Sequence, residues 1–150
     1  MKIRLASNND LDFILNMYNQ IWEERENNIE ELRNIVKSVI SNKDSDIFIV
    51  TINENDIATF TLNYRLDLWS IWKALRLTAM IVDQEYRSKW IWTKIMKWVE
   101  KYWKDNWFSI IELLSWIKRV NAHEFYRKNW YNVIEYGFIK AIKKFKNKYV

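Results

Sequence analysis

The stretch that decides the fold is LRLTAMIVDQEYRSKWIWTKIMKWVEKYWKDNW, residues 75–107. Its first part, Leu75–Val82, is mostly apolar, which is typical of a strand covered on both sides. Alternation predicts that four of its side chains share one face: Leu75, Leu77, Ala79 and Ile81. Its last part predicts an amphipathic helix, because apolar residues recur at helical spacing: Ile91, Ile95, Trp98, Val99 and Tyr102.

Residues 84–92, QEYRSKWIW, join this strand to this helix. Such a junction gathers free backbone N–H groups at a helix N-terminus. The helix dipole there favours an anion, and Arg87 and Lys89 add positive charge, so the junction predicts a phosphate site. The alternative for Arg87 and Lys89 is a solvated charged turn.

This junction resembles the acyl-coenzyme A pyrophosphate loop of the GNAT superfamily of N-acetyltransferases. The family pattern is Arg or Gln, two residues, Gly, one residue, and Gly or Ala. Arg87 fills the first position, whereas Trp90 and Trp92 stand where the family has glycine. Small residues let the backbone approach the diphosphate closely, and an indole would fill that space.

A second stretch, residues 110–138, resembles the family's fifth strand, Asn-containing turn and last helix. The residues that match are Asn121, Ala122, Phe125, Tyr126 and Tyr131. Trp130 again occupies a glycine position. The two motifs occur in the family's order, and the resemblance covers nearly the whole chain.

The resemblance implies an α/β (α+β) fold: a central mixed, mostly antiparallel twisted sheet of about six to seven strands, flanked by about four helices. Patterns along the chain predict strand, two helices, three strands, helix, strand, helix, strand. The expected strands are Lys2–Ala6, Ile47–Ile52, Ile57–Tyr64, Leu75–Val82 and Phe108–Ser115, followed by a final strand or hairpin over Tyr131–Phe145. A loop is expected over Arg65–Lys73.

The resemblance also implies an activity, the transfer of acetyl from acetyl-coenzyme A to a primary amine by direct attack in a ternary complex. It implies these cofactor-binding residues: Met80, Ile81, Val82, Arg87, Ser88, Lys89, Trp90, Ile91, Trp92, Thr93 and Asn121. Tyr126 is the implied general acid toward the coenzyme A thiolate. Taken alone, Tyr126 is an ordinary helix aromatic beside Phe125, and Asn121 is equally a helix N-cap.

Glu112 is the candidate general base, because a buried carboxylate on that strand could have a raised pKa. Its alternatives are a solvent-facing strand residue or a partner for a lysine. Deprotonation of the amine through ordered water is a third route.

Composition limits the remaining function classes. The chain has 150 residues, no cysteine and one histidine, so we expect one domain over residues 1–150, no disulfide framework and no metal site. Without an apolar run of membrane-spanning length or a signal-peptide pattern, a cytoplasmic protein without a membrane partner is expected. The net charge of +5 would fit non-specific contact with nucleic acid, but its default interpretation is a solvated basic end that keeps the protein soluble, so no specific nucleic-acid partner is expected. A homodimer is left open.

Ten tryptophans, one glycine and no proline are abnormal for a chain of this length, in which average usage gives roughly ten glycines. Trp107 and Trp130 each follow a helix end, where a left-handed C-cap glycine is expected. We interpret many of these tryptophans as translations of a codon that one genetic code reads as tryptophan and another reads as glycine. The alternative is a genuine tryptophan-rich protein.

The sequence therefore predicts a single-domain GNAT-like N-acetyltransferase whose acceptor, a small-molecule or protein amine, is left open. The other candidate is a catalytically inactive GNAT-like binding module, which native indoles at positions 90 and 92 would favour.

Overall fold

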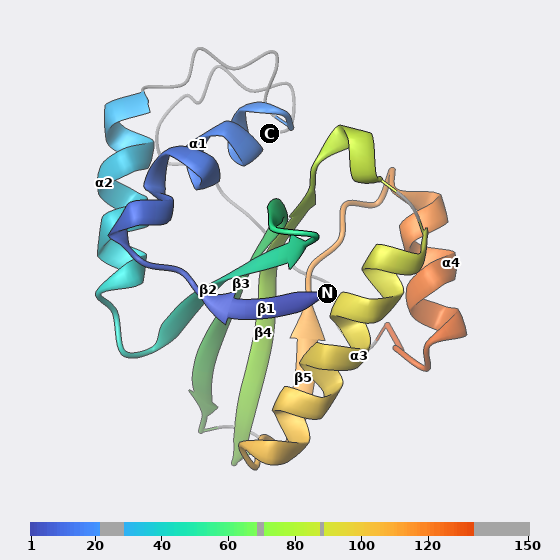
Figure 1. Cartoon of the computed structure of the whole chain (residues 1–150). Helices are drawn as coiled ribbons and strands as arrows, with labels where there is room; N and C mark the ends of the chain where they lie inside the picture. The colour runs from blue at the N-terminus through green and yellow to red at the C-terminus, as the bar shows by residue number, and fades with distance from the viewer. Residues whose placement is uncertain (22–28, 69–70, 88, 134–150) are drawn as a thin grey trace. The chain divides into compact units, whose positions relative to one another are not determined.

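A computed structural model describes residues 1–21, 29–68, 71–87 and 89–133 of the chain (Figure 1). It has two compact units, Met1–Leu113 and Leu114–Val150. The first unit contains β1 (Lys2–Leu5), η1 (Asn8–Asp10), α1 (Leu11–Asn19), α2 (Ile29–Ile40), β2 (Ser45–Ile52), β3 (Asn55–Asp67), β4 (Trp72–Val82), η2 (Gln84–Tyr86), α3 (Lys89–Asp105) and β5 (Ile110–Leu113). The described part of the second contains α4 (Val120–Lys128).

The sheet has five strands in the order β1-β2-β3-β4-β5. Neighbouring strands are antiparallel, except that β5 runs parallel to β4. The expected mixed, mostly antiparallel sheet is therefore confirmed, and so are four α-helices within the described residues. The expected six to seven strands are not confirmed, and most of the strand expected over Tyr131–Phe145 lies outside the described residues.

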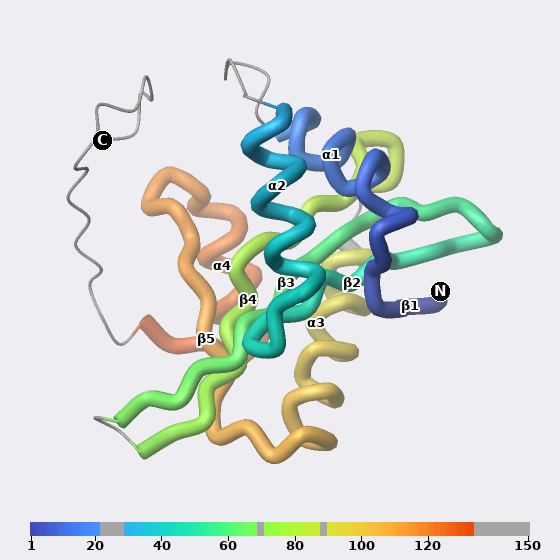
Figure 2. Tube along the Cα trace, turned by 90° about the vertical axis from the view of Figure 1, so that its left-hand side faces the viewer, coloured from blue at the N-terminus to red at the C-terminus, as the bar shows by residue number. Residues whose placement is uncertain are grey.

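The prediction of a loop over Arg65–Lys73 is wrong at both ends of that range. β3 continues to Asp67 and β4 begins at Trp72, with Arg65 paired to Ala74 and Asp67 to Trp72. Figure 2 shows the two strands side by side along this extension. Side chains alternate in polarity over residues 65–68, and no proline interrupts either strand, so the extended pairing meets no local obstacle.

A β-bulge in β4 changes which side chains of the central strand lie on the same face of the sheet. Thr61 pairs with Ala79, while the next residue of β3, Leu62, pairs with Leu77, so Thr78 is the extra residue. An extra residue reverses the alternation of side chains. Leu75 and Leu77 therefore lie on the opposite face from Ala79 and Ile81, and the prediction that all four share one face is wrong.

Both faces of the sheet carry a hydrophobic layer. On one face, Trp98 of α3 meets the rings of Phe48 and Phe60 edge-on, with centroids 5.0 and 5.7 Å away. The other face packs against α1 and α2 through a buried cluster: Leu11, Ile14, Leu15, Leu32, Val36, Ile47 and Ile49. Burial on both sides explains why the central strands are apolar along most of their length.

Tryptophan stands at the left-handed position after two helices, as expected. At the end of α3, Trp107 has φ 57°, its N–H donates to Lys104 O (3.3 Å), and Phe108 N–H donates to Trp103 O (3.2 Å). These two bonds form a Schellman motif. Trp130, with φ 66°, forms the same motif after α4. Both indoles are exposed, Trp107 at 86% and Trp130 at 92%.

Trp107→Gly is therefore expected to stabilise the protein by about 1 kcal/mol, because glycine adopts positive φ without the Cβ clash and the exposed indole contributes little packing. Urea unfolding measures the change. Trp107→Ala is the matched control, since it removes the indole and keeps the Cβ. An equal gain in both variants would show that the backbone conformation is not the cause.

The start of the chain is held by Asp10, which is 8% exposed. Arg4 donates to both carboxylate oxygens, at 2.7 and 2.9 Å, and Ser7 N–H donates to Oδ2 at 2.7 Å. The hydrogen bonds from Arg4 are the main cause that lowers the pKa of Asp10 to about 2. The charged carboxylate therefore stabilises the folded state.

Asp10→Asn is expected to destabilise the protein by about 2 kcal/mol at pH 7. Because the pKa is lowered on folding, this stabilisation is complete above about pH 4 and is lost as the pH falls toward 2. The measurement is urea unfolding of wild type and variant between pH 2 and 7. Asp12→Asn is the control. Asp12 forms an exposed surface ion pair with Arg33, so its replacement should change the free energy of unfolding little. A pH-independent difference would contradict the linkage.

Candidate active site

The candidate site begins where β5 stops pairing with β4. β5 pairs with β4 only from Ala74 to Leu77, whereas β4 continues to Val82. From Thr78 onward, no strand among the described residues pairs with the outer edge of β4. An unpaired edge of this kind presents backbone donors and acceptors to an extended ligand.

Alternation along β4 identifies the backbone groups at this open edge. Asp83 N–H donates to Ile57 O of β3 (2.9 Å), so it points toward the sheet. Successive residues alternate, and the N–H and C=O groups of Val82 and Met80 therefore point outward. Arg87 agrees with this assignment, since its Nε donates to Val82 O (3.1 Å). The structure thus brings Met80, Val82 and Arg87 together.

The N-terminus of α3 follows this edge. The helix begins at Lys89, and its first N–H groups have no acceptor within the helix. Ile91 is 1% exposed, so it can offer only its backbone, and Thr93 is half-buried. Ser88 lies outside the described residues, as does the side chain of Lys89.

Two indoles flank these N–H groups. Trp90 is 48% exposed, and Lys94 Nζ lies 4.6 Å from the centre of its ring. Trp92 is half-buried. Both are in the first turn of α3, where the free amides are.

Glu112, the candidate base, lies in an ion-pair cluster on β5. Its carboxylate is 2.7 Å from Arg76 Nε and 3.4 Å from Arg65 Nη2, and its side chain is 23% exposed. The carboxylate is therefore neither isolated nor fully buried. This geometry agrees with the alternative interpretation, an ion-pair partner, although the partners are arginines rather than a lysine.

Tyr126 and Asn121 belong to the second unit. Tyr126 is half-buried and meets the ring of Tyr131 edge-on, with centroids 5.9 Å apart. Burial raises the pKa of Tyr126, while the charge of Arg119 acts in the opposite direction. A tyrosine is protonated at neutral pH even at its ordinary pKa, and burial acts in the same direction; the protonated phenol is the state that a general acid needs.

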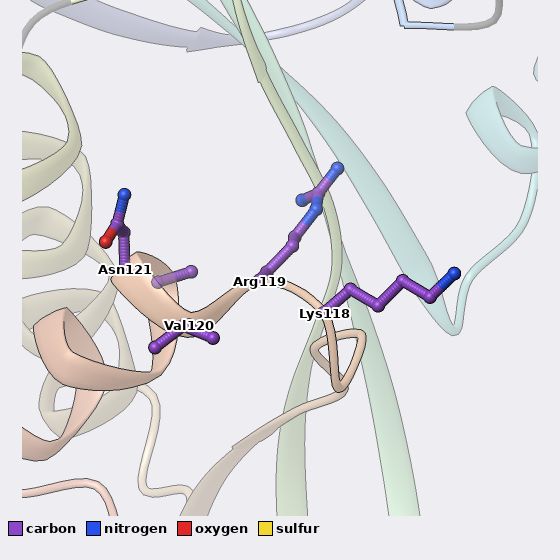
Figure 3. Close-up of a pocket in the computed structure, with 5 residues that line it drawn as sticks. Lys118, Arg119, Val120 and Asn121 are labelled. Atoms are coloured by element: carbon purple, nitrogen blue, oxygen red, sulfur yellow. The ribbon is translucent and has the colours of Figure 1, made fainter.

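An open pocket of about 350 Å³ lies at the start of α4, lined by Lys118, Arg119, Val120, Asn121 and Ala122. Figure 3 shows that the side chains of Lys118, Arg119 and Asn121 point in different directions. The N-cap of α4 is Arg119, so the N-cap alternative for Asn121 is wrong. Asn121 lies in the first turn and is exposed.

Sequence reasoning missed a second pocket, of about 390 Å³, lined by Phe13, Asn16, Met17, Asn19, Gln20, Asp83 and Gln84. It lies where the end of α1 meets the end of β4. Asp83 carries a local signal, since aspartate favours the position before a helical turn. Gln20 carries none for this pocket, because its partners in the turn after β4 lie 63 and 64 residues away; its contact within α1, to Met17 Sδ, is a weak 3.9 Å bond.

Comparison with known proteins gives a result in structure only. No protein-family model and no curated protein sequence matches the chain. Among solved structures, a possible acetyltransferase from Clostridium difficile 630 matches with TM-score 0.75 and 23% identity, over 93% of this chain and 98% of that one. An aminoglycoside acetyltransferase from an uncultured soil metagenomic sample matches with TM-score 0.76 and 17% identity, over 95% and 96%. The chain has the fold of these acetyltransferases.

The acetyltransferase fold does not by itself assign an activity. A transcriptional regulator from Bacillus halodurans C-125 has it too, with TM-score 0.80 and 16% identity over 94% of this chain and 99% of that one. The described residues include no group of three or more His, Cys, Asp or Glu side chains that could hold a metal ion. No described helix is both long and apolar enough to cross a bilayer.

Proposed function

We propose that this chain is an N-acetyltransferase that transfers acetyl from acetyl-coenzyme A to a primary amine by direct attack in a ternary complex. The observation that carries the proposal is the open outer edge of β4, with the backbone groups of Met80 and Val82 directed away from β3. An amide-containing pantetheine arm can pair with such an edge as a short extra strand does.

The neighbouring features support the same ligand. The free N–H groups of α3 start seven residues after Val82, a position suited to a diphosphate that follows the pantetheine arm. Arg87, already hydrogen-bonded to Val82 O, adds a positive charge beside the edge. Residues 88–93 and Asn121 complete the proposed cofactor-binding set. Ile81, expected in this set, is left out because alternation from Asp83 directs its backbone groups toward β3.

In the proposed reaction, the amine nitrogen attacks the thioester carbon and forms a tetrahedral oxyanion. An outward N–H of β4 stabilises that charge. Collapse breaks the C–S bond, and Tyr126 protonates the leaving thiolate. The proton lost by the amine goes to ordered water or to Glu112, which has to separate from its arginine partners first.

The glycine-like positions are part of the proposal. We infer that tryptophans 90, 92, 107 and 130 occupy places where a functional chain carries glycine. The positive φ of Trp107 and Trp130 supports this, since a left-handed conformation costs a tryptophan roughly 1–2 kcal/mol that glycine avoids. Peptide mass spectra from the source cells with tryptophan at these positions would contradict it.

Calorimetric titration with acetyl-coenzyme A, followed by an assay for thiol release with a panel of primary amines, tests the function. Saturable binding with amine-dependent release of coenzyme A is expected. The second candidate, an inactive module, is favoured by the exposed indole of Trp90 beside the free amides of α3. Binding without thiol release across the panel would support that candidate. A folded protein that binds no acetyl-coenzyme A, either as wild type or with Trp90→Gly and Trp92→Gly, would contradict the enzyme.

A further inference from the structure

The side chain of Gln20, at the end of α1, is hydrogen-bonded at both ends of its amide to the turn that follows β4. Its Nε2 donates to Asp83 Oδ2 (2.7 Å), and its Oε1 accepts from Gln84 N–H (3.1 Å). The chemistry of the partners fixes the orientation of the amide, because a flipped group would oppose N–H to N–H and oxygen to carboxylate.

This contact completes the hydrogen bonding of the turn. Glu85 N–H donates to Asp83 Oδ1 (2.9 Å), and Tyr86 N–H donates to Asp83 O (2.9 Å). With Gln20 in place, both carboxylate oxygens of Asp83 and three successive N–H groups of the turn are engaged. The N–H groups of the turn therefore already have acceptors. They do not compete with the free N–H groups at the start of α3 for an anion.

We propose that Gln20 is a positioning residue that fixes the β4–α3 junction for the diphosphate of acetyl-coenzyme A. The role rests on the proposed function and concerns its cofactor site. Gln20 does not touch the proposed diphosphate position. It acts through Asp83 and Gln84, which lie between the open edge of β4 and the first turn of α3.

Two hydrogen bonds, one of them to a carboxylate, support this junction. Their loss in Gln20→Leu is expected to weaken acetyl-coenzyme A binding on the order of tenfold. It is also expected to speed amide hydrogen exchange at Gln84 and Glu85, while the exchange of the buried strands stays unchanged. Asn19→Leu is the matched control, because Asn19 lines the same pocket and no side-chain hydrogen bond of it is found in the described part of the chain.

A reciprocal exchange separates positioning from general stability. Gln20→Glu alone places two carboxylates together and should weaken binding at least as much as Gln20→Leu. Combining Gln20→Glu with Asp83→Asn restores the hydrogen bond in the opposite direction, because the asparagine amide N–H then faces the glutamate carboxylate. An asparagine there still accepts from Glu85 N–H, so the double variant should recover affinity to within about twofold of wild type.

Calorimetry and hydrogen exchange on the full chain decide between the outcomes. Unchanged affinity in Gln20→Leu, unchanged exchange at residues 84 and 85, or no recovery in the double variant would each overturn the positioning role while acetyl-coenzyme A still binds the wild type. If the protein bound no acetyl-coenzyme A either as wild type or with Trp90→Gly and Trp92→Gly, the proposed function would be overturned, and this role with it.

Discussion

Tyr126→Phe is expected to lower kcat on the order of 100-fold, with acetyl-coenzyme A affinity changed by less than about twofold. The phenol is proposed to protonate the leaving thiolate, and the ring alone cannot supply a proton. Because burial raises its pKa, Tyr126 stays protonated at neutral pH, so wild-type kcat should not fall between pH 7 and 9 through loss of this acid. Steady-state kinetics of thiol release, run at saturating acetyl-coenzyme A, gives kcat for both proteins.

The matched control for this substitution is Tyr131→Phe, which removes a phenol from the same aromatic group. If Tyr126 is the acid, Tyr131→Phe should keep most of the wild-type kcat. If the two variants lose activity equally, the effect comes from packing around α4. If Tyr126→Phe kept the full kcat, water rather than Tyr126 would be the donor of the proton to the leaving thiolate.

Replacing both Trp90 and Trp92 by glycine is expected to tighten acetyl-coenzyme A binding by 100-fold or more, which is about 2.7 kcal/mol. Both indoles lie in the first turn of α3, where the free N–H groups would meet the diphosphate. Glycine lets the phosphate oxygens approach those amides. Calorimetric titration of the two forms measures the difference.

Stability moves in the opposite direction, which makes this result easy to interpret. Each glycine in the first turn of a helix costs roughly 0.5–1 kcal/mol, so tighter binding cannot come from a more stable fold. Trp107→Gly serves as the control, since it is expected to raise stability without changing affinity. Equal binding by the wild type and the double variant would mean that the indoles are tolerated. That result would contradict the glycine interpretation of the loop.

Local patterns in the sequence determined most of the elements. The helical spacing of Ile91, Ile95 and Val99 predicted the buried stripe of α3, and all three are at most 1% exposed. The polar residues after Lys104 and Lys128 predicted helix ends, and Trp107 and Trp130 are left-handed there. These features depend on neighbours within a few residues along the chain, so the sequence contains their physical cause.

Pairing between distant segments was decided by the tertiary structure. The bulge at Thr78 is defined by the pairing of β4 with β3, whose register shifts between Thr61 and Leu62. The alternation of β4 alone does not show where an extra residue falls. The open edge of β4 likewise depends on β5 ending its pairing at Leu77. The site residues on this edge were expected from a family resemblance, but their outward direction came from the register.

Side-chain partners across long sequence separations were also invisible in the sequence. Glu112 was a candidate base on the strength of its strand, whereas the fold places it against Arg65 and Arg76. Gln20 had no signal at all, although it joins α1 to the turn after β4. Local spacing sets helices, strands and caps, because those energies arise between near neighbours. Charge pairs and bridging amides arise between segments that meet only after the chain has folded, so only the tertiary structure determines them.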